Sequence, residues 1–371
     1  MKLFSRRTLL TASATMLAVP SLAVPVGLAL VPTRFANPYE VAALRARKGK
    51  PGPANAQCPA MSPPARDLVV PDFYADPPIY SRIDRDRLEA RNALVRPIEA
   101  ISRNLTSSAD RWAQSVPADA RHASCAVAIL DAMAQADSTL GQVNIQGGFE
   151  RKWMFCALAL AHLKIVSAEE YSEAAQDRVR TWFARYLPHL RETYDKPPGR
   201  GPAPSMQLNN HATWAGICAM ALALAVGDEA TWHWGISRIR LTLDQVDAQG
   251  FLPLEVLRGA KALHYHSFTL GPLALAAFLA RPNGVDLAGA ADGPFHRLAK
   301  RTHDAYVDPS AFEARTGKTQ EPFSRFYDMA WVEIYAGEFA RPEFAAALGD
   351  RRPQFQSWLG GDLTLWHAKD R

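Results

Sequence analysis

Residues 207–226 read QLNNHATWAGICAMALALAV, a polar start followed by an almost unbroken apolar run. The run has no Pro and carries apolar residues at three- and four-residue spacing, which predicts an apolar helix over Gln207–Val226. The preceding segment, Lys196–Pro202, reads KPPGRGP and predicts a loop, because its Pro and Gly residues oppose a helix. This stretch indicates a helical fold with a polar cluster at the start of one helix.

The same apolar spacing recurs along most of the chain and indicates an all-α protein. Ser167 and Glu170 form a capping-box pattern at the start of one of these helices. No pair of strands and no sharp repeat is evident in the sequence. The further predicted helices are Asp84–Ile101, Ala118–Met133, Phe149–Leu163, Ala168–Leu187, Ala230–Val246, Ala262–Leu279, Phe295–Tyr306 and Phe323–Phe339.

Helices of this length with short connections favour helical hairpins that curl into an incomplete (α/α) toroid with a deep cleft on one face. An irregular helical bundle is the alternative, and periodicity alone does not separate the two. Residues 31–78 are rich in Pro and Ala and predict an extended N-terminal arm. Residues 79–371 then form the helical domain.

The first 30 residues have the features of an export signal. Lys2, Arg6 and Arg7 precede an apolar run that extends to about Leu30. The run Ser5–Leu10 is similar to a twin-arginine signal, and a Sec signal is the alternative. An uncleaved membrane anchor is a further alternative, because the run is long enough to span a bilayer. We expect cleavage and a periplasmic or secreted protein, with no stable membrane insertion.

Composition limits the classes of partner. The chain has 371 residues, 48% of them hydrophobic, which is enough for a sizeable core. Its net charge is +5 and its pI about 9.0, which suits an acidic partner. No basic block coincides with a nucleic-acid-binding motif, so we expect no nucleic acid partner.

The four cysteines are Cys58, Cys125, Cys156 and Cys218, and their spacing does not resemble a zinc site. Export to an oxidising compartment makes one disulfide plausible. Cys156 and Cys218 lie in apolar helical runs, where a buried free thiol is expected.

Two segments carry side chains that are unusual for a core. Asn209, Asn210 and His211 open the apolar helix, and Trp214 follows Asn210 by one helical turn. Asn also caps helices, so this cluster alone has a purely structural explanation. The second segment, 250–266, contains GFLPLE and then RGAKALHYH.

In the second segment Arg258 and Tyr265 share a helical face, with the small Ala262 between them. The alternative is a surface Arg and a half-buried Tyr bonded to the backbone. His264 and His266 flank Tyr265 and cannot both share its face of a helix.

Together the two segments offer an amide, an imidazole, a guanidinium and a phenol, which suit β-elimination in a uronate polymer. Removal of the C5 proton puts charge on a carboxylate, which an enzyme must neutralise with hydrogen bonds or positive charge. Arg matches a carboxylate with its planar fork. Tyr can act as base or acid once neighbouring cations lower its pKa from about 10. No metal-ligand cluster or cofactor motif is evident.

These motifs closely resemble family 5 polysaccharide lyases, the poly(mannuronate) lyases. The resemblance rests on NNH with Trp214, on GFLPLE, and on Arg-Gly-x-x-Ala-Leu-x-Tyr-His, in the family's order and separation. Residues 146–153 (QGGFERKW) and 328–335 (DMAWVEIY) are similar to further family stretches. The resemblance covers residues 58–339.

The resemblance implies an incomplete (α/α) toroid and a lyase that needs no cofactor. Tyr265 would be the base and acid of a syn elimination, and His211 the base for the other epimer. Asn210, His211 and Arg258 would neutralise or support the substrate carboxylate. Cys58 and Cys125 match the family's disulfide. The substrate-binding positions it implies, to which we add Arg82, are Tyr80, Gln146, Arg151, Trp153, Trp214 and His266.

The chain departs from the family in its lid, which usually carries a Lys-Tyr pair. Alignment places Tyr80 on the Tyr and Ile79 on the Lys, with Arg82 as a substitute cation. The loss of that Lys keeps a polyglucuronate or a heteropolysaccharide open as the substrate besides alginate. Rivals from other classes are a glycoside hydrolase, which needs two carboxylates, and a non-catalytic polysaccharide-binding protein. We expect a monomer.

Overall fold

Nearly all the predicted helices form, and most of their starts coincide with capping side chains. The computed structural model describes residues 35–53, 57–77, 80, 82–198, 205–322 and 329–369, and the predicted signal segment 1–30 lies outside these ranges. The helices are α1 (Val41–Lys48), α2 (Arg85–Gln114), α3 (Ala120–Gln135), α4 (Ile145–Ile165), α5 (Glu173–Tyr194), α6 (Asn210–Val226), α7 (Glu229–Leu243), α8 (Pro253–Val256), η1 (Gly259–Lys261), α9 (Ala262–Ala280), η2 (Arg281–Asn283), α10 (Pro294–Asp304), α11 (Ser310–Thr316), α12 (Ala330–Phe339), α13 (Pro342–Ala346), η4 (Gly349–Arg351), η5 (Ser357–Leu359) and α14 (Leu363–His367).

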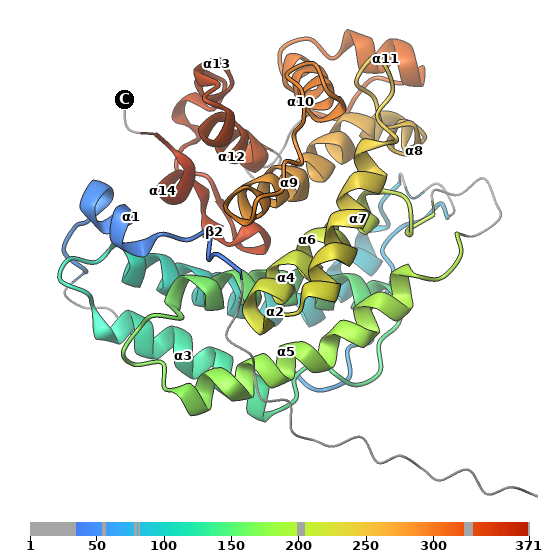
Figure 1. Cartoon of the computed structure of the whole chain (residues 1–371). Coiled ribbons are helices and arrows are strands. Elements are labelled where there is room, and N and C mark those ends of the chain that lie inside the picture. Colours follow the sequence, from blue (N-terminus) through green and yellow to red (C-terminus); the bar gives the residue numbers. More distant parts are fainter. Residues whose placement is uncertain are drawn as a thin grey trace, which may run out of the picture. The chain divides into compact units, whose positions relative to one another are not determined.

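The long helices form two layers of an incomplete (α/α) toroid (Figure 1). The inner helices α2, α4, α6, α9 and α12 contact one another in that order, and α3, α5, α7, α10 and α13 pack outside them. Helices α4, α6 and α9 are buried on nearly every face, as expected for helices that are apolar all round. The predicted all-α toroid is confirmed.

Helix boundaries follow local chemistry more closely than apolar spacing. Helix α2 begins after Asp84, whose carboxylate accepts the amide hydrogens of the first turn, and it continues through Pro97 to Gln114. Helix α5 begins after Ser172, five residues beyond the predicted capping box. That prediction was wrong, because Ser167 lies in a turn and its segment does not continue as helix.

The N-terminal arm packs on the helical body. It contains a helix that its Pro- and Ala-rich composition did not predict. Helix α1 buries Leu44. Farther along, the amide of Asn144, the N-cap of α4, binds both backbone groups of Val70. A Cβ at Gly147 would overlap the carbonyl oxygen of Leu68, so only Gly allows the arm to approach α4 this closely.

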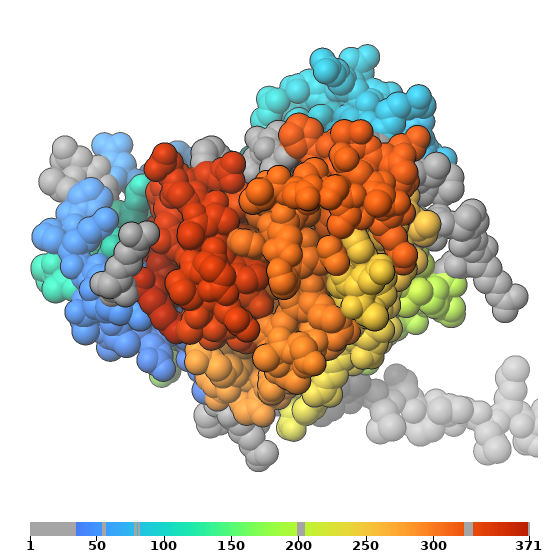
Figure 2. All heavy atoms as spheres, turned by 90° about the horizontal axis from the view of Figure 1, so that it is seen from above, coloured from blue at the N-terminus to red at the C-terminus, as the bar shows by residue number. Residues whose placement is uncertain are grey.

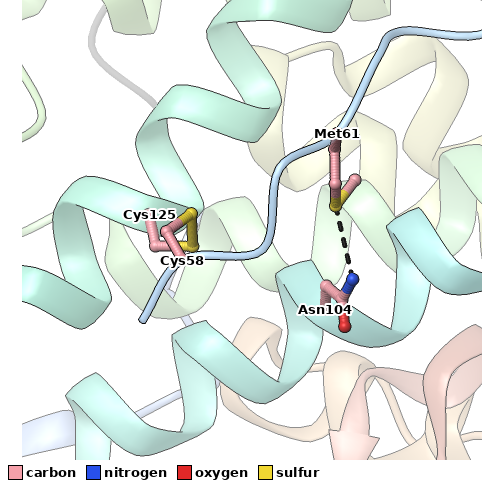
Figure 3. Close-up of a disulfide and its surroundings, with 4 residues drawn as sticks. All are labelled: Cys58, Met61, Asn104 and Cys125. Carbon is pink, nitrogen blue, oxygen red and sulfur yellow. Dashed lines mark hydrogen bonds between the residues drawn. A yellow bond between two sulfur atoms is a disulfide. The ribbon is translucent and has the colours of Figure 1, made fainter. Parts of the chain in front are cut away.

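One disulfide ties the arm to the body (Figure 3). Cys58 in the arm is bonded to Cys125 of α3, with their Cα atoms 5.4 Å apart. Cys156 and Cys218 are free and buried. The predicted bond and the two predicted free thiols are confirmed.

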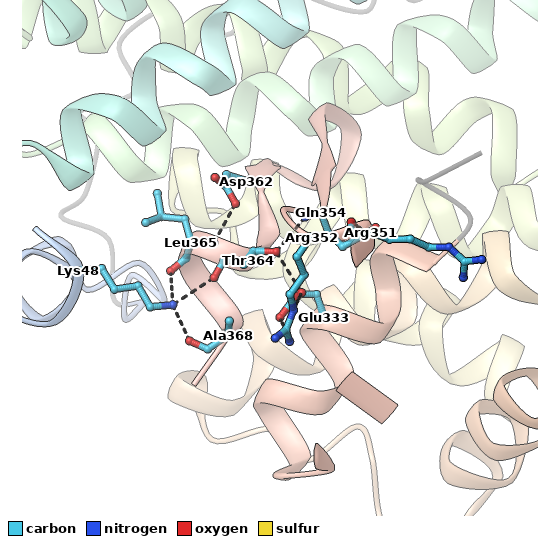
Figure 4. Close-up of polar contacts among 9 residues, drawn as sticks. All are labelled: Lys48, Glu333, Arg351, Arg352, Gln354, Asp362, Thr364, Leu365 and Ala368. Carbon is cyan, nitrogen blue, oxygen red and sulfur yellow. Dashed lines mark hydrogen bonds and ion pairs between the residues drawn. The ribbon is translucent and has the colours of Figure 1, made fainter. Parts of the chain in front are cut away.

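The C-terminal segment returns to the arm. A short antiparallel pair, β1 (Phe355–Gln356) and β2 (Gly361–Asp362), is the one regular strand pairing in the described ranges, and the sequence did not predict it. The Lys48 ammonium donates to the carbonyl oxygens of Thr364, Leu365 and Ala368 at 2.5–3.1 Å (Figure 4). Figure 2 shows the red C-terminal segment beside the orange segment, with blue N-terminal residues at its edge.

None of the helices in the described ranges is long and apolar enough to span a membrane.

Candidate active site

The first turn of α6 is held by an unusual carboxylate. Asn209 is the N-cap, and its side chain accepts the amide hydrogen of His211 at 2.9 Å. The backbone N–H of Asn210 donates to Oε1 of Glu255 at 2.7 Å, and its Nδ2 lies 3.0 and 3.2 Å from the two Glu255 oxygens. Glu255 is buried, and burial is the main reason why its pKa is raised. Helix capping therefore explains the position of Asn209, whereas hydrogen bonds to Glu255 fix the side chain of Asn210.

Arg258 and Tyr265 lie face to face. The guanidinium carbon of Arg258 is 3.6 Å from the centre of the Tyr265 ring. They are not on one continuous helix, because Arg258 precedes η1 and Tyr265 lies in the first turn of α9. Nη2 of Arg258 donates to the carbonyl oxygen of Tyr80 at 2.6 Å, and its Nε is buried without a partner in the described part of the chain.

The hydroxyl of Tyr265 meets a second tyrosine. Tyr74 lies on the hairpin in which Tyr74 bridges to Ile83, and its hydroxyl is 2.6 Å from that of Tyr265. Alignment had placed Tyr80 on the family's lid tyrosine, but Tyr80 contributes its carbonyl oxygen and a ring edge against Tyr74. Ile79, the residue aligned with the family's Lys, lies outside the described residues.

Burial controls the protonation of the two candidate bases. It is the largest cause that raises the pKa of Tyr265 well above its usual value; Tyr74 adds to the rise and Arg258 opposes it. The expectation that cations would bring this pKa below 10 is not met in this structure. Burial also lowers the pKa of His211 well below its usual value, helped by the charges of Lys152 and Arg258.

His211 is enclosed from behind by α4 and α5. Its ring stacks on Phe149 of α4 with centroids 3.7 Å apart. The buried ammonium of Lys152 lies 3.4 Å from its Nδ1 and 2.6 Å from the hydroxyl of Tyr194 on α5. The predicted cluster of Asn210, His211, Arg258 and Tyr265 thus has defined neighbours on every side.

An aromatic group adjoins His211. Trp153 stacks on Trp358 of η5 with centroids 4.6 Å apart, and Trp214 packs edge-on against Trp153. Both Trp153 and Trp214 are buried and their indole nitrogens have no partner in the described part of the chain. Trp153 lies 6.0 Å from the His211 ring.

Two predicted substrate-binding residues, His266 and Arg151, are buried and bonded within the fold, and their contact with substrate stays a prediction. His266 is fully buried: its Nε2 accepts the amide hydrogen of Leu252 at 2.8 Å and its Nδ1 lies 2.8 Å from the carbonyl oxygen of Ala262. Arg151 is buried against α5, donates to the carbonyl oxygen of Thr139 at 3.1 Å, and lies over the ring of Tyr186. Both hold the fold together.

Two further predicted positions, Gln146 and Arg82, have contacts of different kinds. The amide of Gln146 donates to Glu150 at 2.8 Å, so this donor is occupied. Arg82 is exposed on the Tyr74 hairpin, where its backbone N–H donates to Asp76 at 2.8 Å. The predicted contacts of Arg82 and Gln146 with substrate stay predictions.

Four residues at the site escaped sequence reasoning as members of it: Tyr74, Lys152, Glu255 and Trp358. Lys152 lay within the quoted stretch QGGFERKW, and Glu255 closes GFLPLE, so the motifs contained a signal for both. Tyr74 and Trp358 come from a hairpin and a C-terminal turn with no helical pattern.

Residues from the N-terminal parts of three helices meet at this place. Asn210 and His211 open α6, Tyr265 lies in the first turn of α9, and Phe149 and Lys152 lie in the second turn of α4. Helix N-termini carry partial positive charge and unpaired N–H groups. With Arg258 they make the site favourable for an anion.

Within the described ranges, no group of three or more His, Cys, Asp or Glu side chains could hold a metal ion.

Comparison with known proteins agrees with this arrangement. A family model described as alginate lyase matches residues 66–312. A polysaccharide lyase of Stenotrophomonas maltophilia strain K279a is 30% identical over 348 residues, 93% of this chain and 96% of the relative. An alginate lyase of Azotobacter chroococcum mcd 1 is 31% identical over 336 residues, 87% of this chain and 86% of the relative.

The fold is shared with a solved lyase. The structure of alginate lyase A1-III complexed with a tetrasaccharide matches with a TM-score of 0.76 and 23% identity, over 90% of this chain and 95% of the other. A second structure of A1-III, from Sphingomonas species A1, matches with a TM-score of 0.73. The family match over two thirds of the sequence and the near full-length relatives show that this chain belongs to the alginate lyase family and is a polysaccharide lyase.

Proposed function

We propose that this protein cleaves a uronate polymer by β-elimination that leaves a 4,5-unsaturated uronate end. Alginate or polymannuronate is the first candidate substrate. The observation that carries the proposal is the contact of the Arg258 guanidinium with the ring of Tyr265, 3.6 Å from its centre. It places a fixed cation next to a phenol, at the meeting point of helix N-termini. A cation that can pair with a carboxylate and a group that can move a proton are the two requirements of this elimination.

The reaction needs one proton to change places. The step starts from the Tyr265 phenolate, the form that Arg258 favours and burial disfavours. Its oxygen takes the C5 proton and becomes the neutral phenol, the electron pair of that bond forms the C4–C5 double bond, and the C4–O4 bond breaks. The departing O4 takes a proton, which Tyr265 can return if both groups lie on the same face of the sugar. No water is consumed.

The charge that develops on the carboxylate is met by Arg258. Its buried Nε–H has no partner in the described part of the chain and is free to donate to a substrate oxygen. Asn210 keeps its Nδ2 on Glu255, and its Oδ1 is a buried acceptor without a partner. In this geometry Arg258 supplies the positive charge, and Asn210 accepts a hydrogen bond from the sugar unless substrate binding turns its amide.

The substrate must displace the side chain of Tyr74. Tyr265, Arg258 and Asn210 are all buried when the Tyr74 hydroxyl touches that of Tyr265. A polymer chain cannot reach the phenol without separating these two hydroxyls. We therefore propose that the Tyr74 side chain moves away from Tyr265 when the polymer binds.

A glycoside hydrolase mechanism has less support. It requires two carboxyl groups on either side of the scissile bond. Glu255 is the acidic residue nearest to the cluster in the motifs, and its oxygens are occupied by Asn210. Glu255 is 1% exposed, and its contacts with Asn210 support a role in positioning the first turn of α6.

The test is a panel of polymers assayed for the ultraviolet absorbance of the C4–C5 double bond. Polymannuronate, polyguluronate and polyglucuronate would be compared, with the Tyr265→Phe variant as the control for each. We expect most product from polymannuronate. Highest activity on polyglucuronate would transfer the proposal to that polymer. Binding without unsaturated product on any of them would support a non-catalytic binding protein instead.

We further propose export of the chain and cleavage of its first 30 residues. The Cys58–Cys125 disulfide supports this, because structural disulfides persist in oxidising compartments. Cell fractionation and N-terminal sequencing of the mature protein test it, and an intact N-terminus in the membrane fraction would contradict it. We propose that the exported chain acts as a monomer, which light scattering of the purified protein would check.

A further inference from the structure

Lys152 is a cation enclosed in the interior of the protein directly behind His211. Its side chain lies on α4, is 0% exposed, and points between α5 and α6. A buried ammonium is costly unless its hydrogens are all bonded. The arrangement of acceptors around it therefore carries information about their protonation.

Three acceptors surround the Lys152 nitrogen. They are the hydroxyl oxygen of Tyr194 at 2.6 Å, the carbonyl oxygen of His211 at 3.2 Å and Nδ1 of His211 at 3.4 Å. An ammonium group has three N–H donors and no acceptor. All three donors are used only if Nδ1 of His211 is unprotonated, since a protonated Nδ1 would place two donors against each other.

We propose that Lys152 is a positioning residue that holds His211 in the tautomer with its proton on Nε2. His211 then presents an N–H donor to the substrate and cannot act as the base. The stacking of its ring on Phe149 at 3.7 Å and the bond from its backbone N–H to Asn209 keep the imidazole in this orientation. This inference rests on the proposed function, in which it leaves the proton abstraction to Tyr265.

The charges around Lys152 and His211 favour a neutral His211 imidazole. Glu150 and Cys156 on α4, Tyr194 on α5, Cys218 on α6 and Arg258 before α9 are the titratable groups that act on Lys152 or His211. Burial raises the pKa of both thiols, which are therefore neutral at ordinary pH. The positive charges of Lys152 and Arg258 both lower the pKa of His211 and so disfavour protonation of its imidazole.

The restraint has a pH limit. Burial lowers the pKa of Lys152 to about 7. Below that pH the ammonium donates to Nδ1 and the tautomer is held. Above it, a neutral amine can also accept a hydrogen bond, so Nδ1 can carry the proton and Nε2 can become an acceptor. The direction of the His211 hydrogen bond to substrate is thus set by a residue that does not touch the substrate.

The tautomer of His211 can be measured by NMR without an activity assay. The full chain labelled with ¹⁵N-histidine would be studied at pH 6 by long-range ¹H–¹⁵N correlation, with His211→Gln identifying the resonance among 10 histidines. We expect an unprotonated Nδ1 and a protonated Nε2. A proton on Nδ1 would overturn the inference. The unsaturated-product assay decides the proposed function separately, since nitrogen shifts do not depend on catalysis.

Two variants separate position from mere packing. Lys152→Met keeps an unbranched apolar side chain but removes the charge, and the pKa of His211 should rise toward about 6.5. Tyr194→Phe removes another contact of Lys152 and leaves the contact with Nδ1, so its tautomer should match the wild type. An unchanged His211 pKa in Lys152→Met, or loss of the tautomer in Tyr194→Phe, would refute the proposal. If Lys152→Met does not fold, the wild type and Tyr194→Phe spectra still decide.

Discussion

Tyr265→Phe should abolish most of the turnover of this lyase while leaving its fold intact. The substitution removes one oxygen atom, and within the described residues that oxygen makes a single hydrogen bond, to the hydroxyl of Tyr74 at 2.6 Å. The ring that packs under Arg258 remains. The change thus isolates the proton-transferring atom from the packing of the site.

The expected magnitudes differ enough to be told apart. A lost hydrogen bond between two hydroxyls costs about 0.5–1.5 kcal/mol of stability, and Tyr74 is only half-buried and can bind water instead. A general acid–base group contributes about 10²–10⁴-fold in rate, which corresponds to about 3–5 kcal/mol of activation free energy. Folding should therefore change little while kcat falls by at least about 100-fold, with a smaller change in KM.

Tyr74→Phe is the matched control, because it breaks the same hydrogen bond from the other side. Initial rates of double-bond formation and urea unfolding curves would be measured for both variants. If proton transfer by Tyr265 is the essential step, Tyr265→Phe should be far slower than Tyr74→Phe at equal stability. Equal losses in both would mean that the hydrogen bond matters and the phenol oxygen does not. Near wild-type turnover in Tyr265→Phe would refute the assignment of the base.

Three further predictions follow from single contacts. Arg258→Lys should lower kcat/KM by at least about tenfold, since an ammonium cannot reproduce the planar fork over Tyr265; unchanged kinetics would count against a carboxylate contact. Lys152 has a folded-state pKa of about 7, below its usual 10.5, so the unfolded chain binds more protons between these values and this residue makes stability rise with pH there. The difference in unfolding free energy between wild type and Lys152→Met should therefore grow in favour of wild type by up to about 1.4 kcal/mol per pH unit above pH 7, as urea titrations at pH 7, 8 and 9 would show, and a constant difference would contradict it. Cys58→Ser opens a loop with a sequence separation of 67 residues, and chain entropy predicts that the free energy of unfolding falls by about 4 kcal/mol. Urea unfolding measures this loss, and reduced wild type is the control, which should be equally destabilised.

The fold was predictable because its signal is repeated. The inner helices α4, α6 and α9 are apolar over most of their surfaces, so α6 and α9 were identified nearly to their ends. Boundaries set by one side chain were harder: Ser172 caps α5, although Ser167 and Glu170 match the capping pattern better. Helix α1 has only eight residues and buries one of them, too little for a periodic pattern to be visible.

The site was predictable in its motif residues and not in their partners. Asn210, His211, Arg258 and Tyr265 stand in short motifs, but Tyr74 reaches Tyr265 from a position 191 residues earlier in the chain. His266 shows the opposite case, a motif residue whose contacts lie within the fold. It sits within the motif beside Tyr265, yet one residue farther along a helix turns a side chain by about 100°, and its two nitrogens bind Leu252 and Ala262.

The topology also explains how a site with few cationic side chains can suit a polyanion. In a toroid of helical hairpins the inner helices run in the same direction, so α4, α6 and α9 bring their N-terminal turns to one place. Their dipoles add positive potential there without any ion pair. Glu255 uses up part of that potential at α6 by accepting the amide hydrogen of Asn210. What is left, together with Arg258, acts on a substrate that brings a carboxylate in every uronate unit. An exposed lysine patch would bind such a polymer equally well in any register, whereas charges fixed at helix ends act at one sugar. This is the property that the proposed elimination at a single C5–O4 pair requires.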